Sequence, residues 1–277
     1  MNQRAMRAII RKDLKVVRQS LAVLIPLIMV PLVLLVILPG MGGILLSNAD
    51  PESETIQDFR DETATLFDNL PDTINERLEH YDNEVQRIAY IIFNLFFPSL
   101  YLLLPIMVAN VIAADSFVGE KERKTLEALF YTPISDRELY LAKIIGPWVA
   151  GIAIGWLGYI AFAFVVTVTT LSFMGEAFIL DLTWLLLIVW IVPAAAGLGL
   201  GAMVLVSSRV STFQEAYQLG AIVVLPLLLL LFSQIGGIIY FTPLFVLIIG
   251  AVVWLLTMGL ILFGAQSFRR GELIARL

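Results

Sequence analysis

Cysteine is absent from the 277 residues of this sequence, and histidine occurs once, as His80. Without cysteine there can be no disulfide, thiol nucleophile or thiolate metal ligand, and one histidine cannot build a zinc site of several histidines. Charge is missing from long stretches as well, since no Asp, Glu, Lys, Arg or His occurs from Ala216 to Phe268. A helix in a soluble core does not need such a run, whereas a helix that crosses a bilayer does. His80 lies in a polar segment, where we expect it to be solvated.

A phosphate-binding loop is also missing. The pattern G-x-x-x-x-G-K-[ST] uses a glycine-rich turn and a following lysine to hold phosphates. No lysine of this chain follows a glycine; the lysines are Lys12, Lys15, Lys121, Lys124 and Lys143. We therefore expect no ATP binding by this device, no catalytic residue, and no cofactor or metal site in this chain. Glu176 and Asp181 share a short polar loop and are expected to be solvated rather than a catalytic pair.

Apolar residues dominate what the sequence does contain, making up 59% of it with a mean hydropathy of +0.89. They gather in six segments, each long enough for a tilted helix to cross about 30 Å of hydrocarbon. The segments are Leu21–Leu46, Ile88–Ala114, Ile144–Leu171, Leu182–Val206, Leu219–Phe241 and Leu244–Ala265. In lipid the backbone must satisfy its own hydrogen bonds, so spans are helices or a closed barrel, and the period-2 alternation of a barrel is absent. The sequence predicts an all-α integral membrane protein with six transmembrane helices in a single transmembrane domain, residues 1–277.

Two segments leave alternatives open. The first, Leu21–Leu46, is too long for the apolar region of a signal peptide, which has about 7–15 residues, so we interpret it as a span. Between the fifth and sixth segments, Tyr240–Pro243 leaves almost no loop. This arrangement fits two full spans or a re-entrant hairpin, and the number of apolar residues favours two spans.

The basic residues predict the orientation. Fifteen of the 18 lysines and arginines lie before the first span, between the second and third, after the fourth, or after the sixth. Only Arg60, Arg77 and Arg87 lie on the other side. By the positive-inside rule the first side is cytoplasmic, so both termini are expected in the cytoplasm. The opposite loop, residues 47–87, is acidic, with 12 carboxylates and three basic residues from Asp50 to Arg87.

Residues 1–20 have the pattern of an amphipathic helix. Basic side chains at helical spacing share one face: Arg4, Arg7, Arg11, Lys15 and Arg18. Apolar side chains occupy much of the other face: Met6, Ile9, Ile10, Leu14 and Val17. Such a helix lies on the cytoplasmic membrane surface. It is either a topology signal alone or an elbow helix that also touches a cytoplasmic partner.

The acidic loop of residues 47–87 also shows helical periodicity. Pro71 interrupts the pattern, and Asp72 is placed to be an N-cap. We expect two short helices, of which the second continues into span two. The loop is too short for a large substrate-binding domain, so a lid or a dimer contact fits better.

The loop between spans two and three, residues 115–143, is predicted to form a short helical coupling element. Leu126, Leu129 and Phe130 fall on one helical face, and Glu120 can pair with Lys124 one turn on. Pro133 stops this helix. Ser135 and Glu138 then form a capping box that begins the next helix, which joins rigidly to span three.

This loop resembles the first cytoplasmic loop of type-2 ABC exporter permeases. Their pattern reads approximately E-x-E-[KR]-x-T-x-E-x-L, then P-[IV]-S and a downstream lysine. The matching residues are Glu120, Glu122, Arg123, Thr125, Glu127, Leu129, Pro133, Ile134, Ser135 and Lys143. The chain departs at Lys124, where the family often has glycine, and a lysine there favours a continuous helix. Residues 207–220 and Pro226 resemble the second cytoplasmic loop and span five of the same family.

The resemblance implies the permease subunit of an ABC exporter in the plasma (inner) membrane of a bacterium or archaeon. It implies a separate ATP-binding subunit that holds ATP and magnesium, a second permease copy or sister permease, and no nucleic acid. The ATPase-coupling interface would comprise Glu120, Glu122, Arg123, Thr125, Leu126, Glu127, Leu129, Phe130 and Pro133. The second cytoplasmic loop would add Arg209, Gln214 and Glu215. The alternatives are a secondary transporter, another membrane protein not driven by ATP, or an intramembrane enzyme, and the uncharged spans argue against them.

Uncharged polar residues do occur in the spans. We expect most of them to form interhelical hydrogen bonds, while some line a pathway. The candidates for the pathway are Asn94, Asn110, Thr167, Ser233 and Gln234. The pairs Gly151/Gly155 and Gly197/Gly201 permit close helix packing. The sequence does not identify the substrate, although an uncharged interior favours hydrophobic or amphipathic cargo.

Overall fold

The computed structural model describes residues 3–62, 70–125, 134–178 and 181–267, which contain helices and no strand. Six of these helices are long and apolar enough to cross a membrane, which confirms the predicted all-α architecture. They are Val23–Ser47, Glu84–Glu122, Asp136–Met174, Leu182–Ser207, Phe213–Ile235 and Pro243–Gln266. We refer to them as spans one to six.

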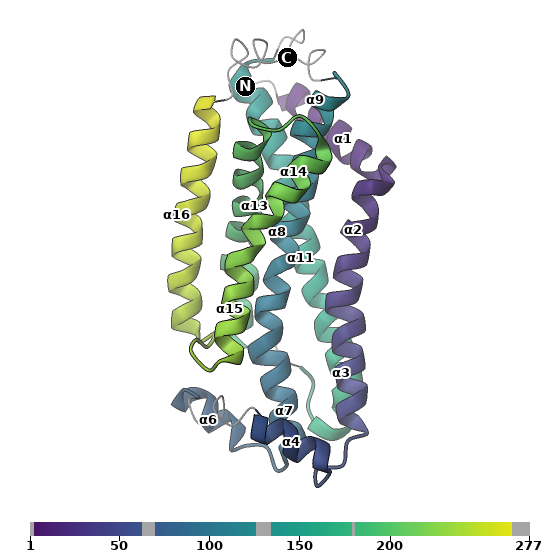
Figure 1. The fold of residues 1–277 in the computed structure, drawn as a ribbon, viewed down its shortest axis with the longest axis vertical. Helices are drawn as coiled ribbons and strands as arrows, with labels where there is room; N and C mark the ends of the chain where they lie inside the picture. The colour runs from purple at the N-terminus through teal and green to yellow at the C-terminus, as the bar shows by residue number, and fades with distance from the viewer. Residues whose placement is uncertain (1–2, 63–69, 126–133, 179–180, 268–277) are drawn as a thin grey trace.

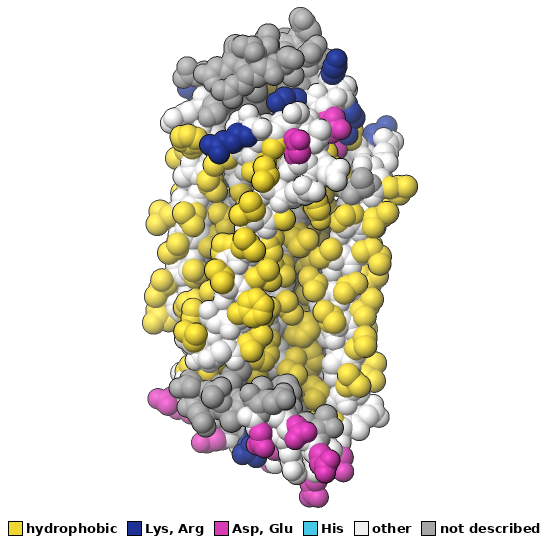
Figure 2. Space-filling view, in the orientation of Figure 1, with side chains coloured by type: hydrophobic (Ala, Val, Ile, Leu, Met, Phe, Trp, Pro, Cys, Tyr) yellow, Lys and Arg dark blue, Asp and Glu magenta, His cyan; other side chains and the backbone are white. Residues whose placement is uncertain are grey.

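The spans form an elongated bundle with the second span at its centre (Figure 1). In its most apolar stretch 72% of the residues are buried, against 17% in spans one and six and 11% in span five. The central part of span two is α8 (Phe97–Ala114), which packs against α11 (Asp136–Met174) and α13 (Val192–Ser207). Figure 2 shows the apolar belt, with most of the visible Lys and Arg at one end and most of the visible Asp and Glu at the other. We call these the basic end and the acidic end.

Three spans contain a short π-helical segment just before a proline. The segments are η1 (Val33–Ile37), η2 (Ile92–Phe96) and η4 (Leu187–Ile191). Each ends two residues before a proline, at Pro39, Pro98 and Pro193 respectively. A proline inside a helix lacks the N–H donor and its ring clashes with the carbonyl four residues earlier. The wider turn of a π-helix relieves this crowding, so the helices continue through the prolines.

The remaining segments of span one are α2 (Leu21–Leu32) and α3 (Leu38–Ser47), and those of span four are α12 (Leu182–Leu186) and α13. Span five joins α14 (Phe213–Gly220), the 3₁₀ turn η5 (Ala221–Val224) and α15 (Leu225–Ile235). It begins and ends six residues earlier than the sequence suggested, because Thr212 caps α14. The residues from Gly236 to Thr242 then form the turn to α16 (Pro243–Ser267), so spans five and six are separate helices that are each long and apolar enough to cross a membrane.

The acidic end differs from the prediction in two respects. Helices α4 (Glu54–Glu62) and α6 (Asp72–Leu78) lie there, but α6 does not continue into span two. Instead α7 (Glu84–Ile91) begins anew, because Asn83 and Gln86 form a capping box. Asp72 is not the N-cap of α6, which is Pro71; Asp72 lies in the first turn, where a carboxylate favours the helix dipole.

Glycines set the closest helix contacts, as the paired glycines predicted. A Cβ at Gly151 would lie 3.0 Å from the Pro105 carbonyl oxygen, and one at Gly155 would lie 2.9 Å from Val192. Gly201 approaches Leu260 of α16 in the same way. The tightest approach to backbone is at Gly199, where a Cβ would lie 2.5 Å from the Ile106 carbonyl oxygen. These glycines therefore pack the spans of one chain against each other.

Candidate functional site: a buried ion-pair network at the basic end

The N-terminal helix α1 (Gln3–Gln19) packs against the protein with its apolar face. Met6 and Ile9 are buried among Ile134, Leu139 and Ala142 at the start of α11. The start of α11 covers these two side chains, whereas Leu14 of the same apolar face is exposed, and the position of α1 at the membrane surface stays a prediction. The opposite face, with the five arginines and lysines named above, is exposed.

Lys143 of α11 is the centre of the site. Its side chain is fully buried, yet its ammonium donates to Glu120 Oε2 at 2.7 Å, to the Ser116 carbonyl oxygen at 2.6 Å and to Ser116 Oγ at 3.2 Å. It also lies 5.5 Å from the ring centroid of Phe117. A buried ammonium is costly unless it is paired and hydrogen-bonded. Lys143 meets both conditions, so the network fixes the start of span three to the end of span two.

The same network includes the N-terminal helix. Lys12 forms an ion pair with Glu120, whose side chain is 5% exposed. Asp13, 4% exposed, accepts a hydrogen bond from the Ser116 hydroxyl at 2.8 Å and lies 3.6 Å from the Lys12 ammonium. Burial raises the pKa of Asp13 above its usual value, although the charge of Lys143 opposes this shift. Three segments that are far apart in the chain thus meet around four charged groups.

The end of span two contributes a π-helical segment and a further ion pair to the network. The fourth π-helical segment, η3 (Asp115–Gly119), carries Ser116 and is followed by no proline. Asp115, also buried, accepts from the guanidinium of Arg123 at 3.0 and 3.1 Å. With this pair the network has three cations and three carboxylates, so its formal charge is zero. Charge compensation of this kind is what permits four of these ionic groups, Asp13, Asp115, Glu120 and Lys143, to be buried together.

The helix that carries Glu120 ends sharply. After α9 (Glu120–Glu122), Lys124 has a φ of 56°, in the left-handed region. The Thr125 amide donates to the Glu120 carbonyl at 2.9 Å and the Lys124 amide to that of Lys121 at 3.1 Å. This is a Schellman motif, whose left-handed position usually holds glycine. The prediction of a continuous helix at Lys124 is therefore wrong, and the glycine typical of the resembled pattern has a structural reason.

The two loops at the basic end are joined to each other. Glu122 Oε2 accepts a hydrogen bond at 2.8 Å from the amide of Phe213, the first residue of α14. Lys121 donates to the Val210 carbonyl oxygen at 3.3 Å. A carboxylate at a helix N-terminus satisfies an amide that has no partner within the helix. Through Glu122 the end of span two is therefore connected to the start of span five.

Only some of the predicted coupling residues lie within the part of the chain that the structure describes. Leu126, Glu127, Leu129, Phe130 and Pro133 lie outside the described residues. Glu120, Glu122 and Arg123 were expected to face a partner. Glu120 is buried within this chain, whereas Glu122 and Arg123 are exposed and also bind groups of this chain, so their contact with a partner stays a prediction. Glu120 pairs with Lys143 and Lys12 instead of Lys124, because the helix ends before Lys124.

The starts of α11 and α14, which flank these loops, agree better with the predictions from the sequence. The capping box of Ser135 and Glu138 is present, and α11 runs from it without interruption to Met174. In the second loop, Arg209 and Gln214 are exposed. Glu215 donates its amide to Thr212 Oγ1 and accepts from the Ser211 amide at 3.2 Å, so it supports the start of α14.

The polar residues proposed for a pathway lie in separate places. Gln234 and Ser99 form a buried hydrogen bond between spans five and two, and Gln234 also donates to the Leu95 carbonyl oxygen at 2.8 Å. Asn94 accepts from the Trp184 indole at 3.3 Å. The remaining three residues contact neither Gln234 nor Asn94. Thr167 accepts from the Phe178 amide, Ser233 donates a hydrogen bond within its own helix, and Asn110 packs against Gly220. These contacts hold helices and turns together, and the structure does not gather the residues into one path.

Sequence reasoning missed Asp13, Ser116 and Asp115, although a signal for Asp13 was present. It is the lone carboxylate before Asp50, and it falls on the apolar stripe of α1, four residues after Ile9 and four before Val17. Glu176 is exposed, as expected, whereas Asp181 is only partly exposed. Each accepts from a residue of the acidic loop, and both line a cavity described below.

These features define a six-span, all-helical membrane protein in which buried polar contacts join the N-terminal helix and the second and third spans at one end, and an exposed hydrogen bond adds the fifth span. Residues 7–264 match the family model described as ABC-2 family transporter protein. The chain belongs to this family and is a permease component of an ABC transporter. Comparison with curated proteins and with solved structures gave no match in either case.

Proposed function

We propose that this chain is the permease subunit of an ABC exporter in a prokaryotic plasma membrane. In this proposal a separate ATP-binding subunit drives it, and it acts with a second copy or a sister permease. The basic end faces the cytoplasm, where the loop of residues 123–135 meets the ATP-binding subunit. The family membership and the basic residues support the proposal, and the buried network at the basic end is the observation that carries its mechanism.

The network explains how a movement of this loop would reach the spans. One end of the loop follows α9 and the other end leads into α11, and the Lys143–Glu120 pair holds these two ends together. A displacement of the loop therefore moves spans two and three as a unit and is not absorbed by a flexible joint. The bond between Glu122 and the Phe213 amide extends this unit to span five.

The exporter is favoured over a carrier driven by an ion gradient. Carriers usually hold ionisable residues in the interior of their spans, where they bind the coupling ion. In the described residues, the charged groups of spans two and three lie at the ends of the spans: Glu84 and Arg87 pair at the acidic end, and Asp115, Glu120 and Lys143 are paired with one another or with neighbouring charges at the basic end. These charged groups therefore stabilise the fold and are not placed in the interior of the spans to bind a coupling ion.

Reconstitution tests the proposal. The purified chain in liposomes should hydrolyse no ATP by itself and should give ATP-dependent export only with an ATP-binding subunit added. ATP hydrolysis by the purified chain, or flux driven by an ion gradient without that subunit, would refute it. In the coupled complex, Glu122→Ala should reduce transport more than ATP hydrolysis, whereas Glu122→Gln, which keeps the acceptor for the Phe213 amide, should retain most of both.

Orientation is tested separately. Because the chain has no cysteine, any introduced cysteine is unique. Arg209 is exposed shortly before α14 at the basic end, and Glu79 is exposed just after α6 at the acidic end (Figure 1). In intact cells an impermeant thiol reagent should label Glu79→Cys and leave Arg209→Cys unlabelled until the membrane is permeabilised. The reverse pattern would place the basic end outside.

A further inference from the structure

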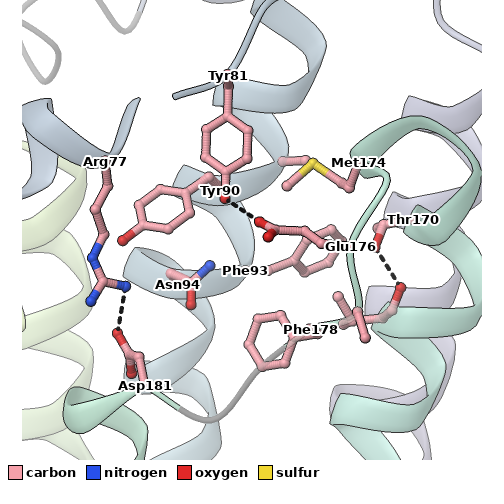
Figure 3. A pocket seen from close by; sticks show the side chains of 13 residues that line it. Arg77, Tyr81, Tyr90, Phe93, Asn94, Thr170, Met174, Glu176, Phe178 and Asp181 are labelled. Atoms are coloured by element: carbon pink, nitrogen blue, oxygen red, sulfur yellow. Dashed lines mark hydrogen bonds and ion pairs between the residues drawn. The ribbon is translucent and has the colours of Figure 1, made fainter. Parts of the chain in front are cut away.

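A cavity of about 370 Å³ lies at the acidic end, within a single chain. Its walls come from four places: α6 and the residues after it, the outer part of span two, the end of α11, and the residues before α12 (Figure 3). Its volume falls within the range of small-molecule sites, about 300–1,000 Å³. The permease mechanism proposed above makes no use of it.

The two carboxylates of the cavity differ in whether a cation pairs with them. Asp181 Oδ2 lies 3.4 Å from the Arg77 guanidinium, and Asp181 Oδ1 accepts from the Trp184 amide at 2.8 Å to cap α12. Glu176 accepts from the Tyr81 hydroxyl at 3.1 Å, and no ion pair within the described ranges includes it. Arg77 compensates Asp181, so the negative charge of Glu176 remains uncompensated at the cavity wall.

Aromatic rings form much of the remaining wall. Tyr81 and Tyr90 lie with ring centroids 5.6 Å apart, and Phe93 and Phe178 complete the lining. Figure 3 shows the rings of Tyr81, Tyr90 and Phe178 around the carboxylate of Glu176. Burial, reinforced by the charge of Glu176, raises the pKa of Tyr81, so its hydroxyl stays protonated and continues to donate. Aromatic faces beside one carboxylate attract a cation that carries apolar groups.

The same wall argues against other ligands. A bare metal ion needs several oxygen or nitrogen ligands in one place, and the described residues contain no group of three or more His, Cys, Asp and Glu able to hold one. An anion would be repelled by Glu176 and by the acidic residues of helices α4 and α6. That acidic surface instead raises the local concentration of cations.

We propose that this cavity binds a monovalent organic ammonium ion with an apolar body. The ammonium lies beside Glu176, and its apolar part packs against the rings of Tyr90, Phe93 and Phe178. Binding itself requires neither ATP nor a second subunit, so it can be tested apart from transport. That the site faces outward rests on the proposed orientation.

Calorimetric titration of the purified full chain in lipid nanodiscs tests this. The probes are phenethylammonium, its neutral analogue 2-phenylethanol, and the anion phenylacetate. We expect saturable binding of phenethylammonium and at least about tenfold weaker binding of the other two probes. Only phenethylammonium carries a positive charge that can pair with the carboxylate of Glu176. Equal binding of the alcohol and the ammonium, or no binding of the ammonium, would overturn the proposal.

Matched variants then locate the site. Glu176→Gln keeps an acceptor for Tyr81 and should weaken ammonium binding about tenfold. Glu79→Gln removes the same charge from an exposed residue that does not line the cavity, and should change binding less than twofold. Phe178→Ala should weaken binding of the ammonium while leaving Glu176 in place. Equal effects of the two glutamate variants would show general surface attraction and refute a built site, as would unchanged binding in Phe178→Ala.

Discussion

Replacement of Lys143 by methionine tests whether the buried network holds the basic end together. The substitution keeps the length of the side chain and removes the ammonium, which is fully buried and donates to Glu120 and Ser116. Glu120 is then left with Lys12 alone, whose side chain is 39% exposed and therefore screened by solvent. Removal of one partner from a buried pair costs about 3–5 kcal/mol, and the network changes from neutral to a formal charge of −1. We expect Lys143→Met to lose about that amount of unfolding free energy.

The measurement is unfolding by sodium dodecyl sulfate in mixed micelles, followed by tryptophan fluorescence. The double variant Lys143→Met with Glu120→Gln restores a neutral network and should cost less than the sum of the two single variants by about 1–3 kcal/mol. Arg137→Met removes a cation from an exposed position of the same helix and should change stability by less than about 0.5 kcal/mol. The reasoning is refuted if Lys143→Met is as stable as Arg137→Met, or if the effects at Lys143 and Glu120 simply add.

Three further predictions concern stability and use the same unfolding measurement. Gly199→Ala should destabilise by about 1–3 kcal/mol, because the new Cβ would lie 2.5 Å from a backbone oxygen, whereas Gly259→Ala meets nothing within 4 Å and should be neutral or stabilise slightly. Lys124→Gly should be more stable than Lys124→Ala by about 1 kcal/mol, since both remove the charge and only alanine keeps a Cβ in the left-handed conformation; equal stabilities would contradict the Schellman assignment. Asp13 has a raised pKa, so the folded chain binds a proton that the unfolded chain releases above pH 3.8, and this contribution to stability is lost as the pH rises through the folded-state value. Asp13→Asn should remove that decline, and an unchanged pH profile would show that Asp13 is not its source.

The fold was largely predictable, and the reason is the bilayer. Lipid requires long uncharged helices, so the six apolar segments of the sequence directly predicted six spans. The errors lie at their ends, where polar capping decides. Span five starts at Phe213 because Thr212 caps it, and span two starts at Glu84, at the capping box of Asn83 and Gln86, and does not continue from α6. Capping residues are common in any polar loop, so their local pattern alone did not distinguish the true helix starts.

The candidate site was predictable only in part. The pattern from Glu120 to Lys143 identified the loop, but not that Glu120 and Lys143 bind each other across the junction it spans. That contact depends on how α9 and α11 cross, which is a tertiary property. Lys124 was misjudged for a related reason: helix propensity favours lysine over glycine, while the chain there needs a left-handed residue to close the Schellman motif.

The docking of α1 has a consequence for the order in which this protein is made. Asp13 leaves the ribosome early, but its partner Ser116 follows 103 residues later, and the apolar cover at Leu139 and Ala142 comes later still. At a synthesis rate of about 5–20 residues per second, α1 exists for roughly 5–20 s before its partners do. The helix that closes the ion-pair network is thus the first to be made, and it can be buried only after the start of α11 has been made.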